Sequence, residues 1–277
     1  MIRSYKDLYL RLSDLPKAKL AVANPKGRDI LDALDNAEKR GWIEPILVND
    51  DSPKLAAARS VELIRKGEAD LLMKGDLDTS IILKAVVDSK TGLRTKNRLS
   101  HIAVVDSPEY DRLMLFTDGG VNIEIDEKIA RSMVENSIGF AKSLGIAKPK
   151  VSVMGLVEKV TSSLPETGFA SMIASEFKND SRLIIEGPVP LDIALSERAA
   201  KIKNYNSKVA GQTDIFIGPS ITTTNFTVKA LLALGNAKGG GIVLGASVPV
   251  ILLSRADSAE TKLNSIALGL IARKGAL

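Results

Sequence analysis

The chain of 277 residues contains no cysteine and only one histidine. The lack of cysteine excludes disulfides, thiolate-bound metals and a cysteine nucleophile. A metal site rich in histidine is impossible, and a Ser-His-Asp triad would have to be built around His101 alone. Because His101 begins the strand-like run HIAVVDS, we interpret it as structural rather than catalytic. The spacing of the carboxylates matches no metal motif, so no metal ligands are predicted.

Aromatic residues make up only 4% of the chain, and no apolar run is long enough to cross a bilayer. The net charge is +5, but the basic residues are spread along the sequence. Proteins that bind nucleic acid concentrate basic charge and offer rings for stacking, so we expect no nucleic-acid partner. The N-terminal segment MIRSYKDLYLRL lacks the apolar core of a signal peptide. We therefore expect a cytoplasmic protein without a membrane partner, whose mild positive charge suits a small polyanionic ligand.

Segments with helical periodicity alternate with short apolar segments throughout the chain. DILDALDNAEKRGW is typical of a helix that stops at Gly41, and EPILVND is typical of the strand after it. Runs such as DIFIG and GIVLG are apolar throughout, as expected for strands covered on both faces. The sequence predicts an α/β protein with a mostly parallel, doubly wound sheet. The polar stretch Lys90–Ser100 is the best candidate for a linker.

Small and polar residues follow many of the predicted strands. In open α/β sheets, ligands bind at the carboxyl ends of the strands. Glycines there allow main-chain N–H groups to approach an anion. The candidates are Lys74-Gly75, Asp106-Ser107, Asp118–Gly120, Glu158, Glu186–Pro188, Gly218–Ser220 and Ser254-Arg255.

The segment VPVILLSRADSAETKLNSIALGL joins a buried strand to a helix with one apolar face. We expect Asp257 to cap this helix, with Glu260 reaching back as in a capping box. Ser254 and Arg255 are not needed for capping. An arginine at a strand end, beside a helix N-terminus, is suited to hold a phosphate or carboxylate.

Two other loops have weaker signals. KGGGIVLG matches neither the P-loop nor the dinucleotide fingerprint, so no NAD or ATP site is predicted. ITTTNFTVK opens a helix that any of Thr222 to Thr224 can cap. Asn225 then lies early in that helix. A contact with a ligand and a purely structural role are equally open for its side chain.

Several motifs together resemble the phosphate acetyl/butyryl transferase family, and its phosphate butyryltransferase branch most. They are ADLLMKG, FTDGGVNI, IIEGPVPLDIALS, VAGQTDIFIGPSITTTN and AKGGGIVLGASVPVILLSRADSAETKLNSIALGL, and the similarity extends from about Ala69 onward. The resemblance implies two doubly wound α/β domains with an active-site cleft between them, as in isocitrate and isopropylmalate dehydrogenases. It places residues 1–94 and 247–277 in the first domain and residues 95–246 in the second.

The resemblance also implies a reaction. Acyl-CoA and phosphate give acyl phosphate and CoA by direct transfer in a ternary complex, with CoA as substrate and no bound cofactor. Butyryl or branched acyl groups are expected, in a homodimer or larger homo-oligomer. Arg255 is expected to hold phosphate charge and Ser254 to stabilise the oxyanion on the acyl carbonyl. Substrate contacts are expected from Lys74, Gly75, Lys84, Asn225 and Ser258.

The chain departs from the family at several of these positions. The aspartate that the acetyltransferase branch uses as a proposed base is replaced by Thr261, so the base is open and Glu260 is a candidate. Lys84 occupies a position where the family usually has an arginine, and Phe169 one where it usually has an aspartate. The segment PSITTTN keeps the asparagine of the family, Asn225, but lacks its acidic residue. These changes motivate an alternative function, a noncatalytic module that senses CoA or acyl phosphate.

Overall fold

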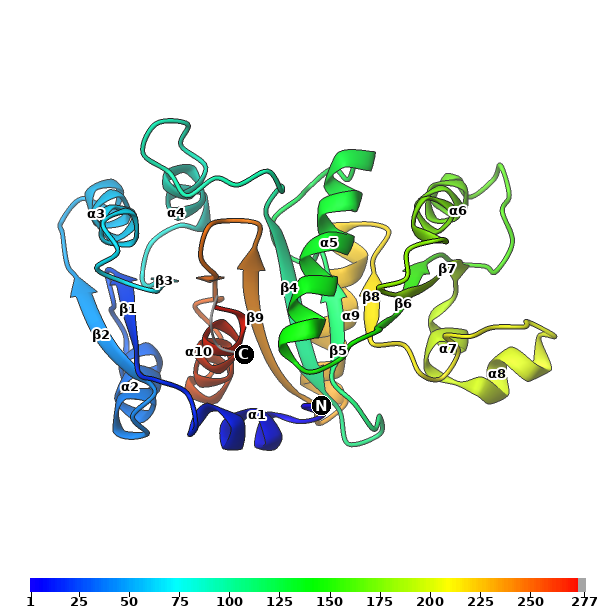
Figure 1. The fold of residues 1–277 in the computed structure, drawn as a ribbon, viewed down its shortest axis with the longest axis horizontal. Helices are drawn as coiled ribbons and strands as arrows, with labels where there is room; N and C mark the ends of the chain where they lie inside the picture. The colour runs from blue at the N-terminus through cyan, green and yellow to red at the C-terminus, as the bar shows by residue number, and fades with distance from the viewer. Residues whose placement is uncertain (274–277) are drawn as a thin grey trace. The chain divides into compact units, whose positions relative to one another are not determined.

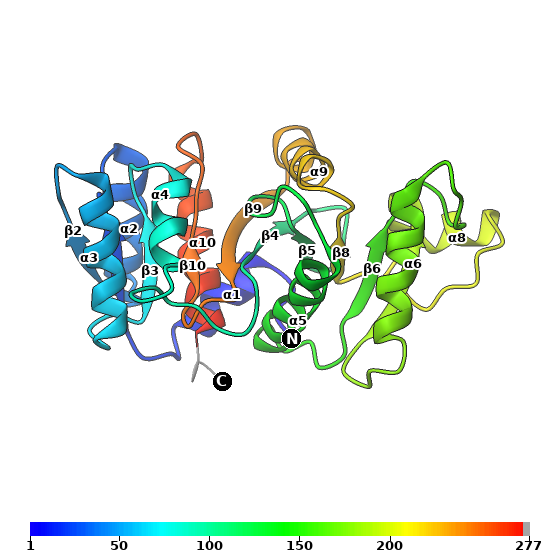
Figure 2. The same ribbon diagram turned by 90° about the horizontal axis from the view of Figure 1, so that it is seen from above.

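The computed structural model describes residues 1–273, and these form two compact units. The terminal unit contains residues 4–99 and the chain from 239 onward, and the central unit contains residues 1–3 and 100–238. In each unit, helices cover both faces of the paired strands (Figures 1 and 2). The predicted α/β class with doubly wound, mostly parallel sheets is confirmed.

The terminal unit is built on the strand order β2-β1-β3-β10-β9. All neighbouring strands in it are parallel except β10 and β9. Figure 1 shows α2 and α10 on one face of this sheet and α3 and α4 on the other. The elements are α1 Tyr5–Leu12, β1 Ala18–Ala23, α2 Arg28–Lys39, β2 Ile43–Val48, α3 Pro53–Arg65, β3 Leu71–Lys74, α4 Thr79–Val86, β9 Lys238–Leu244, β10 Val250–Ile251 and α10 Ala259–Ala272.

The central unit has the strand order β4-β5-β8-β6-β7, and only β4 and β5 are antiparallel. Phe116 and Phe216 stack with ring centroids 4.5 Å apart in its core. The elements are β4 Ser100–Asp106, β5 Met114–Thr117, α5 Glu127–Ser143, β6 Lys150–Met154, α6 Pro165–Phe177, β7 Ile184–Val189, α7 Leu191–Leu195, α8 Glu197–Ile202, β8 Ile215–Ile217 and α9 Ile221–Leu234.

The chain crosses between the units at positions that differ from the expected boundaries. The resemblance implied divisions after residues 94 and 246, whereas the compact units divide after residues 3, 99 and 238. Residues 239–246 belong with the terminal unit because Val243 of β9 pairs with Val250 of β10. Residues 95–99 stay there too, since the Thr95 hydroxyl donates a 2.6 Å hydrogen bond to the carbonyl of Gly245.

The helix boundaries follow local signals in part. Gly41 ends α2 with a φ of +75°, and this predicted stop is confirmed. Two predicted caps are wrong. Ser220, not a threonine, caps α9 by accepting from the Thr223 N–H at 3.2 Å. Ser258, not Asp257, caps α10 by accepting from the Thr261 N–H at 3.2 Å.

Helix α10 is buried on more sides than its sequence pattern indicated. A single apolar face was expected, but residues 262–271 are all buried. The helix packs against α1, α2 and β10, so its polar side chains are enclosed as well. Asn264 and Ser265 bond to the main chain of β9, at Gly239 O and Gly241 N. The expectation is wrong because these bonds satisfy polar groups that the pattern assigned to solvent.

Candidate active site

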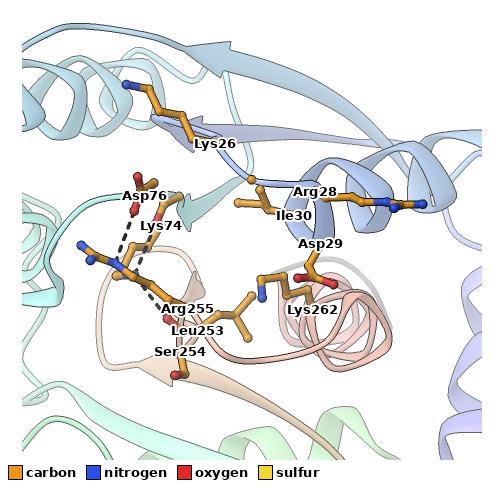
Figure 3. Close-up of a pocket in the computed structure, with 12 residues that line it drawn as sticks. Lys26, Arg28, Asp29, Ile30, Lys74, Asp76, Leu253, Ser254, Arg255 and Lys262 are labelled. Atoms are coloured by element: carbon orange, nitrogen blue, oxygen red, sulfur yellow. Dashed lines mark hydrogen bonds and ion pairs between the residues drawn. The ribbon is translucent and has the colours of Figure 1, made fainter.

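A pocket of about 250 Å³ lies at the carboxyl ends of β1, β3 and β10 (Figure 3). These three strands run parallel, so their carboxyl ends meet at one edge of the sheet. The pocket is entirely within the terminal unit. It is lined by Lys26, Gly27, Arg28, Asp29, Ile30, Lys74, Gly75, Asp76, Leu253, Ser254, Arg255 and Lys262.

The lining carries more positive than negative charge. Five of its residues are cationic and two are acidic: Lys26, Arg28, Lys74, Arg255 and Lys262 against Asp29 and Asp76. The first turn of α2 adds main-chain N–H groups, and no side chain caps that helix. Gly27 occupies its N-cap with a φ of +96°, a conformation that favours glycine. Cations and a helix start together favour an anion in this pocket.

Lys74 is the last residue of β3, whose four residues are all buried. The whole residue is only 4% exposed, and its Nζ donates to the carbonyls of Gly75 and Leu253, at 3.3 Å each. Burial, followed by the positive charge of Arg255, lowers the pKa of Lys74. Lys74 therefore presents a desolvated ammonium group to the pocket.

Gly75 is required by close packing rather than by a ligand. A Cβ there would lie 2.2 Å from the carbonyl oxygen of Asn24 and 2.4 Å from that of Ala23. The Gly75 N–H donates to Ala23 O at 2.8 Å, so the bond ties the end of β3 to the end of β1. Gly75 borders the pocket, but its N–H already has an acceptor.

Ser254 and Arg255 occupy the turn that joins β10 to α10. The Ser254 N–H donates a 2.8 Å bond to Oδ2 of Asp257, which is the carboxylate expected to cap the helix. Arg255 is two-thirds exposed, and its guanidinium contacts Asp76 at 3.3 Å and Asp78 at 3.4 Å. Because this pair is exposed, it contributes little to stability and exchanges readily with other anions.

Lys262 is the residue that sequence reasoning missed. It follows Ser258 by one helical turn, is 6% exposed, and its Nζ donates to the carbonyl of Asp257. Figure 3 shows its side chain running from α10 toward Ile30 and Leu253. The β1–α2 loop was missed as well. The signal was available, because the apolar run AKLAVA is followed directly by NPKGRD.

Residues 52–270 match the family described as "Phosphate acetyl/butaryl transferase". The chain belongs to this family. It is 38% identical to a phosphate butyryltransferase of Clostridium acetobutylicum over 97% of each chain. It is 39% identical to a phosphate acetyltransferase of Rhizobium meliloti, covering 89% of this chain and 86% of the relative.

Solved structures agree with this assignment. A branched-chain phosphotransacylase from Enterococcus faecalis superposes with a TM-score of 0.84 at 28% identity, covering 92% of this chain and 98% of that one. A phosphotransacetylase from Streptococcus pyogenes has the same fold, with a TM-score of 0.82 at 18% identity and 97% and 98% coverage. The family's resemblance to dehydrogenase folds is also visible. A 4-hydroxythreonine-4-phosphate dehydrogenase from Burkholderia phymatum has a TM-score of 0.53 at 14% identity, covering 97% of this chain and 93% of that one.

The structure brings together only some of the residues that the resemblance to this family suggested. Ser254, Arg255, Lys74 and Gly75 line one pocket. Ser258 begins α10, where its hydroxyl accepts from the Thr261 N–H. Whether these residues act as the resemblance implies stays a prediction.

Glu260, the candidate base, is not among the residues that line the pocket. It lies on the first turn of α10, near Tyr9 of α1. Burial and then the negative charge of Glu260 raise the pKa of Tyr9 to about 12. Tyr9 in turn donates its hydroxyl hydrogen to Oδ1 of Asn264. The residue of this helix turn that faces the pocket is Lys262 instead.

Lys84 and Asn225 lie elsewhere. Lys84 borders a separate hollow of about 640 Å³ between α3 and α4, together with Arg59, Arg65 and Asp88. Asn225 belongs to the central unit, where its Nδ2 donates a 2.9 Å bond to Gly119 O. That bond fixes the start of α9 against the loop after β5, so Asn225 has a structural contact of its own.

Two structural features are absent from the described residues. None of the helices within residues 1–273 is long and apolar enough to span a membrane. In the same part of the chain, no group of three or more histidine, aspartate or glutamate side chains is arranged to hold a metal ion.

Proposed function

We propose that this protein transfers a short acyl group between coenzyme A and inorganic phosphate. The activity class follows from the family, whose relatives of 36–38% identity are named phosphate butyryltransferase. One structural observation supports it most. Ser254 and Arg255 border the same pocket as the buried ammonium group of Lys74, and the pocket has an excess of positive charge.

The reaction needs little covalent chemistry from the protein. An oxygen of HPO₄²⁻ attacks the thioester carbonyl, the C–S bond breaks, and the proton of the phosphate ends on the sulfur of CoA. The products are the acyl phosphate and CoA with its free thiol. Cationic groups reduce the repulsion between phosphate and the developing carbonyl oxyanion. Binding both substrates together supplies the rest by proximity, and CoA is the only carrier that the scheme needs.

The residues of the 254–258 turn have distinct roles in this proposal. Arg255 contacts phosphate oxygens after it releases Asp76 and Asp78, and Ser254 donates its hydroxyl hydrogen to the oxyanion. Asp257 fixes the main chain of Ser254 through the 2.8 Å bond. Glu260 stays a candidate base only through an intermediary such as water, because it is not part of the lining.

The acyl group proposed is butyryl or a branched chain of similar size. The support is the phosphate butyryltransferases among the relatives and the branched-chain phosphotransacylase among the solved structures. A purely sensory module is not favoured, since the relatives along nearly the whole chain are named as transferases.

The protein is further proposed to act as a cytoplasmic homodimer or larger homo-oligomer. Helix α9 supports self-association because Thr224 is its only buried residue among those described. Phe226 and Leu234 of this helix are 69% and 88% exposed. Large apolar side chains gathered on one helix are typical of an interface.

The decisive experiment measures thiol release from butyryl-CoA, isobutyryl-CoA and acetyl-CoA, with and without phosphate. Arg255→Ala is compared with Arg11→Ala, which removes an exposed arginine paired with Asp14 at 3.3 Å in the same unit. We expect phosphate-dependent release that is lost in Arg255→Ala and kept in Arg11→Ala. With the parent protein, intact thioesters in the presence of phosphate contradict the proposal, and so does thiol release that does not depend on phosphate. A preference for acetyl-CoA corrects the acyl chain alone.

A further inference from the structure

Lys74 and Lys262 share an unusual environment. They are 4% and 6% exposed, and both line the same pocket. Among the described residues, their Nζ atoms donate only to main-chain carbonyls, of Gly75, Leu253 and Asp257. Within residues 1–273, neither ammonium group has a carboxylate oxygen within 4.0 Å. Buried lysines are almost always paired, because an uncompensated charge away from water is unfavourable.

The acidic residues nearby balance these charges only in part. Asp76 is paired with Arg255 at the exposed rim of the pocket. Burial and the positive charge of Arg255, with a smaller effect of Lys262, lower the pKa of Lys74, whereas the negative charges of Asp76 and Asp78 raise it. The net direction is downward, so the carboxylates offset the burial and the repulsion among the cations only in part. Such repulsion destabilises the empty site and is relieved when an anion enters it.

We propose that Lys262, together with Lys74, binds the phosphoryl group that the enzyme transfers. The inference rests on the proposed function and assigns its phosphate to a definite subsite. A phosphate carries close to two negative charges at neutral pH and has several acceptor oxygens, which match two ammonium donors. Arg255 then serves the exposed side of the same group.

A purely structural role for Lys262 predicts something different. Its Nζ donates to Asp257 O and thereby ties α10 to the turn that carries Ser254. In that case any side chain that keeps a donor preserves function, and phosphate binding is independent of the positive charge. Lys262→Gln separates the two roles, because glutamine keeps an N–H donor and removes the charge.

The first test uses thermal unfolding of the full chain in buffer free of phosphate and sulfate, and then with added inorganic phosphate. Lys262→Gln, Lys262→Met and Lys262→Arg are compared with the parent. Lys66→Met is the matched control, since Lys66 is an exposed lysine of the same unit, paired with Glu62 at 2.8 Å. We expect phosphate to raise the Tm of the parent, of the control and of Lys262→Arg, but not of the Gln and Met variants.

The second test separates the transferred phosphate from the phosphates of CoA itself. Adenosine 3′,5′-bisphosphate, which carries the phosphate groups of the CoA nucleotide end, replaces inorganic phosphate in the same melts. We expect its stabilising effect to survive in Lys262→Gln. In the kinetic assay, the KM for phosphate rises by about tenfold or more in that variant. The KM for butyryl-CoA changes by less than about threefold.

Each outcome has one meaning. Phosphate stabilisation that persists in Lys262→Gln overturns the subsite, and so does loss of the bisphosphate effect alone. If the parent releases no thiol while phosphate stabilises it in a manner that depends on Lys262, the subsite stands and the proposed function fails. If the parent is active and Lys262→Gln keeps its KM for phosphate, the proposed function stands and the subsite fails. If Lys262→Met does not fold, Lys262→Gln and Lys262→Arg decide.

Discussion

Replacing Gly75 with alanine tests whether close packing of β1 and β3 holds the pocket together. The new methyl group would lie 2.2 Å from Asn24 O and 2.4 Å from Ala23 O, both of which belong to the main chain. Ordinary contact begins near 3.4 Å, so the methyl and Asn24 O must separate by a further 1.2 Å, the difference between 2.2 and 3.4 Å. Neither partner is a flexible side chain that can turn away.

The magnitude follows from what must move. Separation of the two strand ends breaks the bonds from Gly75 N to Ala23 O at 2.8 Å and from Asp76 N to Asn24 O at 2.7 Å. Each bond contributes about 1 kcal/mol, and overpacking adds about 1–3 kcal/mol. We therefore expect Gly75→Ala to lower the free energy of unfolding by about 3–5 kcal/mol, a large share of a typical domain's stability.

Urea unfolding provides the assay. The protein has one tryptophan, and Trp42 is buried in the terminal unit, so its fluorescence reports on that unit. Circular dichroism follows both units. Gly139→Ala is the matched control: Gly139 lies within α5 with nothing within 4 Å of an added Cβ. Alanine is the better helix former, so the control gains about 0.5–1 kcal/mol. A Gly75→Ala protein within about 1 kcal/mol of the parent refutes the packing argument.

Three further predictions concern the pocket and α9. Lys74 has a lowered pKa in the folded protein, so between that pKa and 10.5 the unfolded chain holds a proton that the folded chain has released. The stability of the parent relative to Lys74→Met therefore rises with pH through that window. The rise in Tm that phosphate produces declines over the same window, because a neutral amine attracts phosphate less. Thermal melts at several pH values check both expectations, and a stability difference that does not change with pH contradicts the reasoning. Asp257→Ala removes the acceptor of the Ser254 N–H and is expected to lower kcat by about tenfold. Asp257→Asn keeps an acceptor oxygen, so its kcat should fall less. Equal decreases of kcat in steady-state assays of the two variants count against this role of Asp257. Phe226→Lys combined with Leu234→Lys should shift light-scattering mass toward the monomer, because charges on an apolar interface disfavour association; an unchanged mass argues against α9 as the interface.

Local patterns predicted much of the fold because they depend on neighbouring residues. The stop of α2 at Gly41 follows from a left-handed conformation that glycine adopts readily. The apolar runs DIFIG and GIVLG identified β8 and β9 as covered strands. The caps were harder to predict, since serine, threonine and aspartate compete and the choice depends on the angle at which the chain enters the helix. Asp257 does not cap α10 because its carboxylate accepts a hydrogen bond from the Ser254 N–H instead.

The candidate site was predicted only where a strand end carried an unusual residue. Arg255 and Lys74 met that criterion. Lys262 did not, because its place in the helix pattern suggested an exposed lysine, and its burial results from the packing of α10 against other elements. Glu260 and Lys84 were placed near the chemistry by resemblance alone. Their positions depend on the direction of a side chain at a helix start and on the packing of α3 against α4, neither of which sequence spacing determines.

The distribution of charge in the pocket suggests how affinity is obtained there. Arg255 is exposed and already paired with carboxylates, so an entering phosphate must displace Asp76 and Asp78, and the net gain is small. Lys74 and Lys262 are desolvated and have no carboxylate partner among the described residues, so the same phosphate gains the full interaction with both. The buried lysines therefore supply most of the binding free energy, and the arginine supplies the part that exchanges as substrates enter and leave. This division requires that the empty protein be less stable than one with neutral residues at the two lysines, which is the cost of holding the site ready for its anion.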